Sequence, residues 1–364
     1  MHTSNFVFLV VLAAAAGFMI RSVSRLIAIL SFAKSDNRFD NIPARIAHTI
    51  SVAILQKKIL RDKAAGPIHA GIFWGFVILL SAAAEAVLEG IHPALGLTWL
   101  GPLYTVFSLL GDVFCALIIT GVVMSLWRRY VSKIQRLQVE SEKVEAGMIL
   151  LTIGSIVTSL LLQNSSKIAL GADSTWAFRP LSHLVASTIL SGISPDSLEI
   201  LYHIAWWIHI LLILAFTNYL PYSKHLHVLT SVPNVFFSPL DFPNTLEKID
   251  FEAESEIIKF GVSDIEDFSW KTLFDGYTCT HCGRCTSVCP AQQTGKVLDP
   301  REIIIQINKR TMEKGPLLLK LKDVADQFSR ADMQIAAHNV LSGKNSSEYS
   351  PTEREFFESN LSGE

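Results

Sequence analysis

The stretch Cys279-Thr-His-Cys282-Gly-Arg-Cys285-Thr-Ser-Val-Cys289-Pro290 places four of the chain's five cysteines within eleven residues. This spacing, C-x2-C-x2-C-x3-C-P, lets the first three thiolates hold one iron–sulfur cube, while the fourth usually ligates a second cluster. Zinc sites more often use two separated cysteine pairs, and a disulfide framework would need other clustered cysteines. The spacing therefore predicts a [4Fe-4S] cluster on Cys279, Cys282, Cys285 and Cys289.

The composition favours a membrane protein over a soluble globular one. Half of the 364 residues are hydrophobic, and the excess lies mostly in the first 220. The formal net charge of −2 hides basic loops in that part and acidic stretches after residue 240. The fifth cysteine, Cys115, lies in an apolar run, and we expect it only to pack. The other four must be thiolates, so their domain is expected to face the reducing cytoplasm.

Five apolar stretches are long enough to cross about 30 Å of hydrocarbon. They lie near residues 5–30, 66–89, 102–127, 144–163 and 199–221. The first stretch has no Lys or Arg ahead of its apolar core, so we interpret it as a retained helix rather than a signal peptide. The sequence thus predicts an all-α membrane bundle of five transmembrane helices, followed by a small, mainly helical, ferredoxin-like iron–sulfur domain.

The chain is expected to divide into three segments. These are a transmembrane domain over residues 1–229, a linker with an acidic surface segment over 230–268, and an iron–sulfur domain with a polar tail over 269–364. Prolines in the linker predict an extended backbone from residue 230 onward. Apolar spacing within 316–340 predicts an amphipathic helix.

The charge of the loops predicts the orientation. Residues 33–65 carry seven Lys and Arg side chains and residues 128–143 carry five, whereas residues 90–101 carry none. The positive-inside rule puts both basic loops in the cytoplasm and the N-terminus outside. Five crossings then bring the cysteine run to the cytoplasmic side, in agreement with its thiol chemistry.

Three histidines are candidate haem ligands, because a polar ring inside hydrocarbon is costly and neutral imidazole binds haem iron well. His69 opens the second apolar helix at its cytoplasmic end, and His227 lies where the fifth helix emerges. We expect these two to form a ligand pair. His209 lies towards the outer half of the fifth helix, about 27 Å from His227 on the same face if the helix continued straight past Pro221. Hydrogen bonding across helices is the alternative role for these rings.

Two parts of the chain resemble known families. The stretch Trp207-Ile-His209…Lys224-His-Leu-His227…Pro233 resembles the last helix of the gamma-type cytochrome b subunit of respiratory nitrate reductase, with paired histidines at the same spacing. The segment around His69 resembles that family's second helix, which supplies the opposing ligands. Residues 267–300 resemble the iron–sulfur part of heterodisulfide-reductase-type proteins. The fusion is similar to membrane oxidoreductases that link electron-transfer flavoprotein to menaquinone.

The resemblance implies a quinone-linked oxidoreductase, or an electron-transfer subunit of one, in the bacterial cytoplasmic (inner) membrane. It would pass electrons between a cytoplasmic partner and the menaquinone pool through a [4Fe-4S] cluster and haem b. The expected partners are membrane lipid, quinone, and electron-transfer flavoprotein or a cysteine-rich reductase subunit. The alternative is a non-catalytic haem and iron–sulfur anchor of a heterodisulfide-reductase-like complex. No phosphate loop or basic patch predicts nucleotide or nucleic-acid binding.

One departure from the family affects the second haem. The family's second helix carries another histidine ten residues after the first, where this chain has Leu79. His209 therefore lacks its usual partner, and a second haem is left open beside the expected haem on His69 and His227. Candidate replacements on the outer side are His183, His92 and His203.

A second departure concerns the end of the chain. The family continues into further cysteine runs, whereas no cysteine follows Cys289 here. We expect a longer natural polypeptide or a separate subunit to supply the remainder. No residue is marked for the proton chemistry of a quinone. A structural role explains the acidic residues of the apolar half at least as well, namely Glu85, Glu89 and Asp112.

Overall fold

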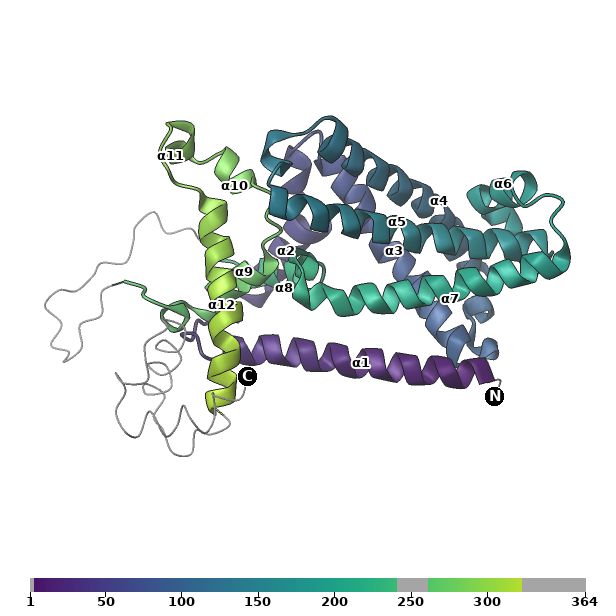
Figure 1. The fold of residues 1–364 in the computed structure, drawn as a ribbon, viewed down its shortest axis with the longest axis horizontal. Coiled ribbons are helices and arrows are strands. Elements are labelled where there is room, and N and C mark those ends of the chain that lie inside the picture. Colours follow the sequence, from purple (N-terminus) through teal and green to yellow (C-terminus); the bar gives the residue numbers. More distant parts are fainter. Residues whose placement is uncertain (1–2, 241–260, 323–364) are drawn as a thin grey trace, which may run out of the picture. The chain divides into compact units, whose positions relative to one another are not determined.

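The computed structural model of this chain describes residues 3–240 and 261–322, and the described part is almost entirely helical (Figure 1). Its β structure in these ranges is limited to one isolated bridge between Lys34 and Ser269. The chain divides into two compact units. The first unit comprises Met1–Arg21, Thr49–His225 and His281–Ser287, and the second comprises Ser22–His48, Leu226–Thr280 and Val288–Glu364.

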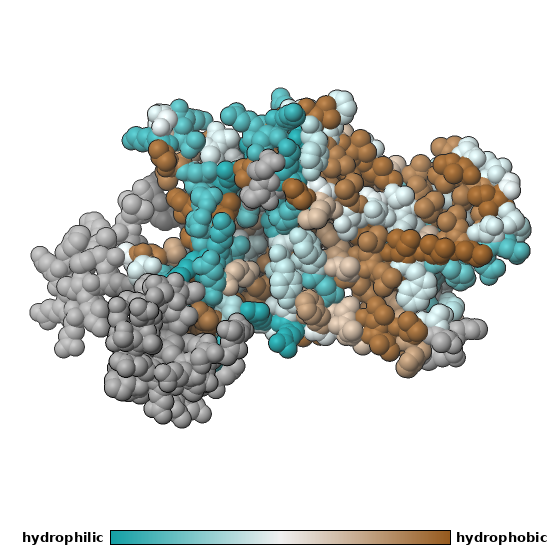
Figure 2. Space-filling model, in the orientation of Figure 1, coloured by the Kyte–Doolittle hydropathy of each residue, from teal (hydrophilic) through white to brown (hydrophobic). Residues whose placement is uncertain are grey.

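Five helices are long and apolar enough to cross a membrane, as the sequence predicts. They are α1 (Thr3–Leu30), α3 (Gly66–Ile91), α4 (Pro102–Leu126), α5 (Glu140–Ala169) and α7 (Pro195–Tyr219). Figure 2 shows hydrophobic side chains, in brown, gathered over the surface of these helices. Because large apolar side chains such as Phe76 and Leu151 are exposed there, this surface is suited to lipid contact.

The remaining helical segments are short, apart from α12. The α-helices are α2 (Ile42–Thr49), α6 (Pro180–Thr188), α8 (His227–Phe236), α9 (Trp270–Thr278), α10 (Arg284–Ser287), α11 (Pro290–Gln293) and α12 (Pro300–Lys322). Single π-helical turns lie at Ile50–Ile54 and Trp127–Val131. Turns of 3-10 helix lie at Ile59–Arg61, Pro93–Leu95, Leu97–Leu100, Gln135–Leu137, Trp176–Phe178, Leu220–Tyr222, Lys224–Leu226 and Ile265–Asp267.

The first unit is built around α5, which packs against α4, α6 and α7, while α3 packs against α4 (Figure 1). Its central apolar cluster joins α4 and α5 through Cys115, Ile118, Val122, Val157 and Leu160. Gly75 allows α3 to approach α4 closely, since a Cβ there would lie 2.5 Å from the Ile118 side chain. Cys115 is buried in this cluster, which agrees with the packing role expected for it.

A buried carboxylate joins α6 to the bundle. Asp112 of α4 is 1% exposed and accepts hydrogen bonds from the backbone N–H groups of Leu181 (2.5 Å) and Ser182 (3.1 Å), and from the Ser182 hydroxyl. These N–H groups belong to the first turn of α6 and have no acceptor within their own helix. Asp112 therefore has a structural role as the acceptor for the start of α6.

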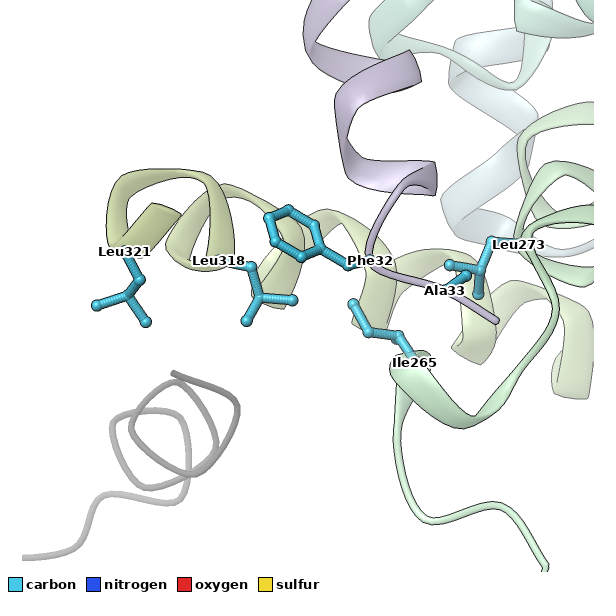
Figure 3. Close-up of a cluster of buried hydrophobic side chains, with 6 residues drawn as sticks. All are labelled: Phe32, Ala33, Ile265, Leu273, Leu318 and Leu321. Carbon is cyan, nitrogen blue, oxygen red and sulfur yellow. The ribbon is translucent and has the colours of Figure 1, made fainter. Parts of the chain in front are cut away.

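The segment that follows α1 is part of the core of the second unit. The N–H of Lys34 donates to the carbonyl of Phe268 (2.8 Å), and the N–H of Trp270 donates to the carbonyl of Lys34 (3.0 Å). Phe32 and Ala33 pack in one apolar cluster with side chains of α9, α12 and the turn before α9 (Figure 3). Those side chains are Ile265, Leu273, Leu318 and Leu321. The basic loop predicted after the first span thus begins inside a hydrophobic core.

A buried arginine joins α2 to the end of α8. Arg45 is 2% exposed, and its guanidinium donates to the carbonyls of Asp40 (2.8 Å), Phe236 (3.0 Å) and Ser238 (2.8 Å). The Asp40 carboxylate lies 2.6 Å from the same group. The last carbonyls of a helix lack intrahelical partners, so Arg45 satisfies the C-terminal end of α8.

The extended backbone predicted from residue 230 is wrong for residues 230–236, which belong to α8. Pro233 lies inside this helix and removes one hydrogen bond, but packing against α9 compensates. The Thr278 hydroxyl of α9 donates to the Thr230 hydroxyl (3.0 Å), and Arg45 satisfies the helix end. The predicted acidic segment falls largely on residues 241–260, outside the described ranges. The start of the helix predicted over 316–340 is part of α12, which begins at Pro300 and is described to Lys322.

Candidate metal centre

The four clustered cysteines lie at the ends of short helices and in the turns between them. Cys279 follows the last residue of α9, and Cys285 lies within α10. Cys289 is the N-cap of α11, directly before Pro290. None of the four forms a disulfide; Cys285 is exposed and the other three are partly exposed. The chain therefore presents four accessible sulfur donors within one short stretch.

The backbone turns sharply on both sides of Cys282. His281 has a φ of 55° and Gly283 a φ of 70°, both in the left-handed region. Glycine adopts this region freely, whereas a residue with a side chain loses about 1–2 kcal/mol there. Two left-handed residues around one cysteine change the chain direction at that thiol. Such turns are what wrapping closely spaced thiolates around one cube requires.

The cluster assignment stands on the donor set and its spacing. Over residues 3–240 and 261–322, no three His, Cys, Asp or Glu side chains converge in the manner of a metal site. Four cysteines at this spacing, none of them in a disulfide, fit a [4Fe-4S] cube, which takes four cysteine ligands.

His69 is held by a glutamine that the sequence did not single out. The ring Nδ1 lies 2.9 Å from the amide oxygen of Gln56, and the Gln56 amide nitrogen donates to the carbonyl of Ala53 (2.7 Å). Because an amide oxygen only accepts, Nδ1 carries the proton and Nε2 is the nitrogen suited to iron. Gln56 is buried and has a φ of 56°. No sequence pattern marks it, since its contact with His69 depends on this left-handed turn.

The start of α3, on which His69 lies, is fixed by Asp62. Its carboxylate accepts the backbone N–H groups of Ala65 (3.0 Å) and Ala64 (3.2 Å) and lies 2.6 Å from the Arg136 guanidinium. The N–H of Ala65 and then Arg136 lower the pKa of Asp62 to about 2. The carboxylate is therefore ionised throughout the physiological range and holds the first turn of α3 in place.

His209 is fully buried between α7 and α5. Its Nδ1 lies 2.9 Å from the carbonyl oxygen of Ile156 and 3.2 Å from the Ser159 hydroxyl. Since the carbonyl only accepts, Nδ1 is protonated and Nε2 carries the lone pair. Nε2 is buried and has no hydrogen-bond partner among the described residues. Leaving such an acceptor unmet costs about 1–3 kcal/mol, and an axial bond to haem iron would satisfy it.

His227 does not lie on the same helix as His209. α7 ends at Tyr219, and Pro221 lies in a 3-10 turn before α8 begins at His227. The distance of about 27 Å predicted between the two histidines on one continuous helix therefore does not apply, because Pro221 interrupts the helix. His69 belongs to the first unit and His227 to the second, so their pairing stays a prediction.

The three candidate replacements for the missing distal ligand are all exposed. His183 packs against the ring of Trp176 and His203 against Tyr202. His92 accepts a hydrogen bond from the N–H of Ala94. None of the three has a described contact with His209.

Comparison with known proteins identifies the domain that carries the cysteines. Residues 271–313 match the 4Fe-4S dicluster domain family. The matched span contains all four clustered cysteines, from Cys279 to Cys289. The C-terminal part of the described chain is therefore a 4Fe-4S domain, in agreement with the prediction from the cysteine spacing.

The chain is also similar to three curated proteins. It is 35% identical over 309 residues (85% of this chain, 43% of the relative) to the probable iron-sulfur-binding oxidoreductase FadF of Bacillus subtilis. It is 31% identical over 296 residues (79% of this chain, 40% of the relative) to the EtfAB:quinone oxidoreductase of Syntrophomonas wolfei. A match of 44 residues, 41% identical, links 12% of this chain to 7% of a probable membrane-anchored ferredoxin of Chromohalobacter salexigens.

No solved structure matches the chain. The matches span less than half the length of the first two relatives, and the resemblance to a nitrate reductase gamma subunit stays a prediction. The chain is thus a homologue of proteins named as iron–sulfur and quinone oxidoreductases, with five helices able to span a membrane and a 4Fe-4S dicluster domain.

Proposed function

We propose that the chain is a membrane electron-transfer protein that passes electrons between a cytoplasmic redox partner and the menaquinone pool, through a [4Fe-4S] cluster and a b-type haem. The observation that carries this proposal is the presence, in one chain, of membrane-length helices with a buried imidazole and a 4Fe-4S domain. The name of the Syntrophomonas wolfei relative favours electron-transfer flavoprotein as the partner and quinone as the substrate. A cysteine-rich reductase subunit is the other partner class.

The chain's own residues would hold and orient the cofactors. Cys279, Cys282, Cys285 and Cys289 would bind the cluster. For haem, the fit is best at His209, whose Nδ1 is held by the Ile156 carbonyl and whose Nε2 lacks a partner among the described residues. We propose His69, oriented by Gln56, and His227 as the ligands of the b-type haem, and His209 as a ligand of a second haem. When bound, these groups would supply one-electron redox chemistry.

The proposed topology follows the charges of the loops. The basic segments 33–65 and 128–143 would lie on the cytoplasmic side of a bacterial inner membrane, with the N-terminus outside. The membrane domain would comprise residues 1–229 and the iron–sulfur domain residues 269–364.

Anaerobic titration with a quinol tests the function. Menadiol added to the full chain in lipid nanodiscs is expected to reduce the chain's cofactors, followed by visible absorption and by EPR. A non-catalytic anchor would show cofactor signals but no quinol-dependent change. That outcome would support the alternative and contradict the proposed function.

The haem ligands can be tested by haem content. His69→Ala and His227→Ala are each expected to remove the same haem, and His209→Ala a different one, because these rings would hold the haem iron. The measurement is pyridine haemochrome per chain together with the reduced-minus-oxidised spectrum. His48→Ala is the matched control, since this ring lies in the last turn of α2 and is not among the candidate ligands, so haem content is expected to stay unchanged. Unchanged haem in His209→Ala rejects that site, and unchanged haem in both other variants rejects the pair.

The role of Gln56 can be separated from simple packing by a potential measurement. The Gln56 oxygen accepts from Nδ1 of His69 and would make the ring a stronger donor to a bound iron. Gln56→Leu is expected to raise the midpoint potential of the haem on His69, and Gln56→Glu to lower it. The haem on His209 serves as an internal control and is expected not to shift. Shifts of the same sign in both variants would contradict this role.

A further inference from the structure

The link between the first two membrane spans contains α2, which continues without a break into the π-helical turn after it (Figure 1). Together they form one apolar helix, Ile42–Ile54. At about 1.5 Å per residue this helix is about 20 Å long, which is too short to cross about 30 Å of hydrocarbon. It is therefore a strongly apolar helix that is not a further span.

The burial of this helix is the reverse of that of a helix on a water-soluble surface. Its polar residues Arg45 and Thr49 are buried. Ile42, Ile46 and Ile50 are 38%, 48% and 48% exposed, and their spacing of four residues places them along one side of the helix. Every exposed residue of the helix is apolar, namely Ile42, Pro43, Ile46, Ala47 and Ile50. A surface helix in water turns its polar residues outward, so this side is suited to an apolar environment.

The C-terminal end of this helix is fixed where the second span begins. Gln56, which follows the helix, lies with its amide oxygen 2.9 Å from Nδ1 of His69 in the first turn of α3. The N–H of Gly66, the first residue of that span, donates to the carbonyl of Asp62 (2.7 Å). The start of a span lies where hydrocarbon meets the lipid head groups, so the end of the helix is held at that depth.

Basic side chains follow the apolar face along the chain. Lys57 and Lys58 are both exposed. The only acidic residue in segment 41–65 is Asp62, and its carboxylate lies 2.6 Å from the Arg136 guanidinium. An apolar helix face with exposed lysines beside it is typical of helices that lie in the plane of a membrane surface and bind anionic lipids.

We infer that Ile42–Ile54 is an in-plane helix whose apolar face lies among the acyl chains of anionic phospholipids, with Lys57 and Lys58 beside their head groups. A second copy of this chain and a partner subunit are the alternative occupants of an apolar face. Lipid is favoured because the helix is tied to the start of a span and is followed by cations rather than by mixed charge. The inference goes beyond the proposed function, since it needs the membrane spans but neither haem nor quinol.

Photocrosslinking tests the position of the helix. p-Benzoylphenylalanine is introduced in place of Ile46 in the full chain, in nanodiscs of equal parts phosphatidylcholine and phosphatidylglycerol, and adducts are identified by mass spectrometry after irradiation. A lipid adduct is expected. The same replacement at Leu151, exposed on α5, is the positive control, and at Lys309, exposed on α12, the negative control. A crosslink from position 46 to a second protein chain in place of lipid, or no lipid adduct where position 151 gives one, overturns the inference.

The identity of the crosslinked lipid tests the two lysines. The phosphatidylglycerol adduct at position 46 is expected to exceed the phosphatidylcholine adduct about fivefold, since basic side chains at the surface attract anionic head groups. Lys57→Gln combined with Lys58→Gln is expected to bring the two adducts to similar amounts while the total yield remains. Similar amounts of both adducts with the lysines in place overturn the preference for anionic lipid.

A second experiment needs no variant. The wild-type chain in the same nanodiscs is labelled with a phosphatidylglycerol that carries a photoactivatable diazirine near its glycerol, at the depth of the head-group boundary. Label is expected on peptides within residues 42–54 as well as on the ends of the spans. Label on the spans without any on residues 42–54 overturns the inference.

Discussion

Replacing Cys282 with Ala is expected to abolish the [4Fe-4S] cluster, whereas replacing Cys115 with Ala is expected to leave it intact. A cube takes four cysteine ligands, and Cys282 is one of the three closely spaced thiols expected to hold it. Cys115 is 1% exposed in the apolar cluster between α4 and α5 and is not part of the cysteine motif. The measurement is iron and acid-labile sulfide per chain after anaerobic purification, with EPR of the reduced protein.

The amount of iron lost in each cysteine variant shows which cysteines hold the cluster. The wild-type chain is expected to contain about four iron atoms in its cluster, and Cys282→Ala close to none. Cys289→Ala is informative beside it, because a fourth cysteine of this spacing usually serves another cluster. Equal loss in both variants indicates one cube held by all four cysteines. Full iron content in Cys282→Ala would contradict the cluster assignment itself.

Lys314→Met is expected to destabilise the second unit by about 3–5 kcal/mol, the usual cost of removing one partner from a buried ion pair. Lys314 is 2% exposed, and its Nζ lies 2.8 Å from carboxylate oxygens of both Asp264 and Glu266. Without it, the nearly buried Asp264 carboxylate keeps its ion pair with Arg310, while the nearly buried Glu266 carboxylate loses the cation beside it. Urea titration of the solubilised chain, followed at the iron–sulfur absorption, measures the change in unfolding free energy.

Lys309→Met is the matched control, because Lys309 lies on the exposed face of the same helix. A surface change of this kind is expected to cost less than about 0.5 kcal/mol. A similar loss in both variants would show that helix propensity or net charge, rather than the buried pair, determines the effect.

The same cluster of charges predicts an acid dependence. Burial alone would raise the pKa of Asp264, but hydrogen bonds from Arg310 and Lys314 outweigh it and hold the pKa well below the usual range. A carboxyl with a lowered pKa stabilises the fold above about pH 3.9, its unfolded value, and loses that contribution as the pH falls towards the folded value. With Lys314 removed, acid unfolding is expected to begin at higher pH. Equal midpoints for the two chains would contradict this account.

The membrane helices were predictable because the signal for them is local. A run of apolar residues long enough to span hydrocarbon carries its own structural consequence, whatever the rest of the chain does. The spacing from Cys279 to Cys289 is equally local, and it indicated the cluster domain that the family match supports. The ends of the observed helices differ from the predicted ends by a few residues. The second span, for example, ends at Ile91 rather than at residue 89.

The features that escaped prediction depend on contacts between distant residues. The proline pattern around Pro233 predicted an extended chain, but α9 and Arg45 stabilise a helix there. The apolar neighbours of His209 in the sequence marked it as a candidate. The position of its proton, on Nδ1, depends on the Ile156 carbonyl of α5, which the sequence does not reveal. Gln56 is an ordinary glutamine in the sequence, and only its burial and its contact with His69 distinguish it.

The position of Phe32 and Ala33 sets an order of events during synthesis. These two side chains leave the ribosome long before Leu273, Leu318 and Leu321 exist, so their shared core cannot close until the membrane helices have been made. Until then, Phe32 and Ala33, which directly follow α1, are exposed to solvent, where chaperones can bind them. Closure of the core of the second unit is therefore a late step of biogenesis, because this core needs both early and late segments of the polypeptide.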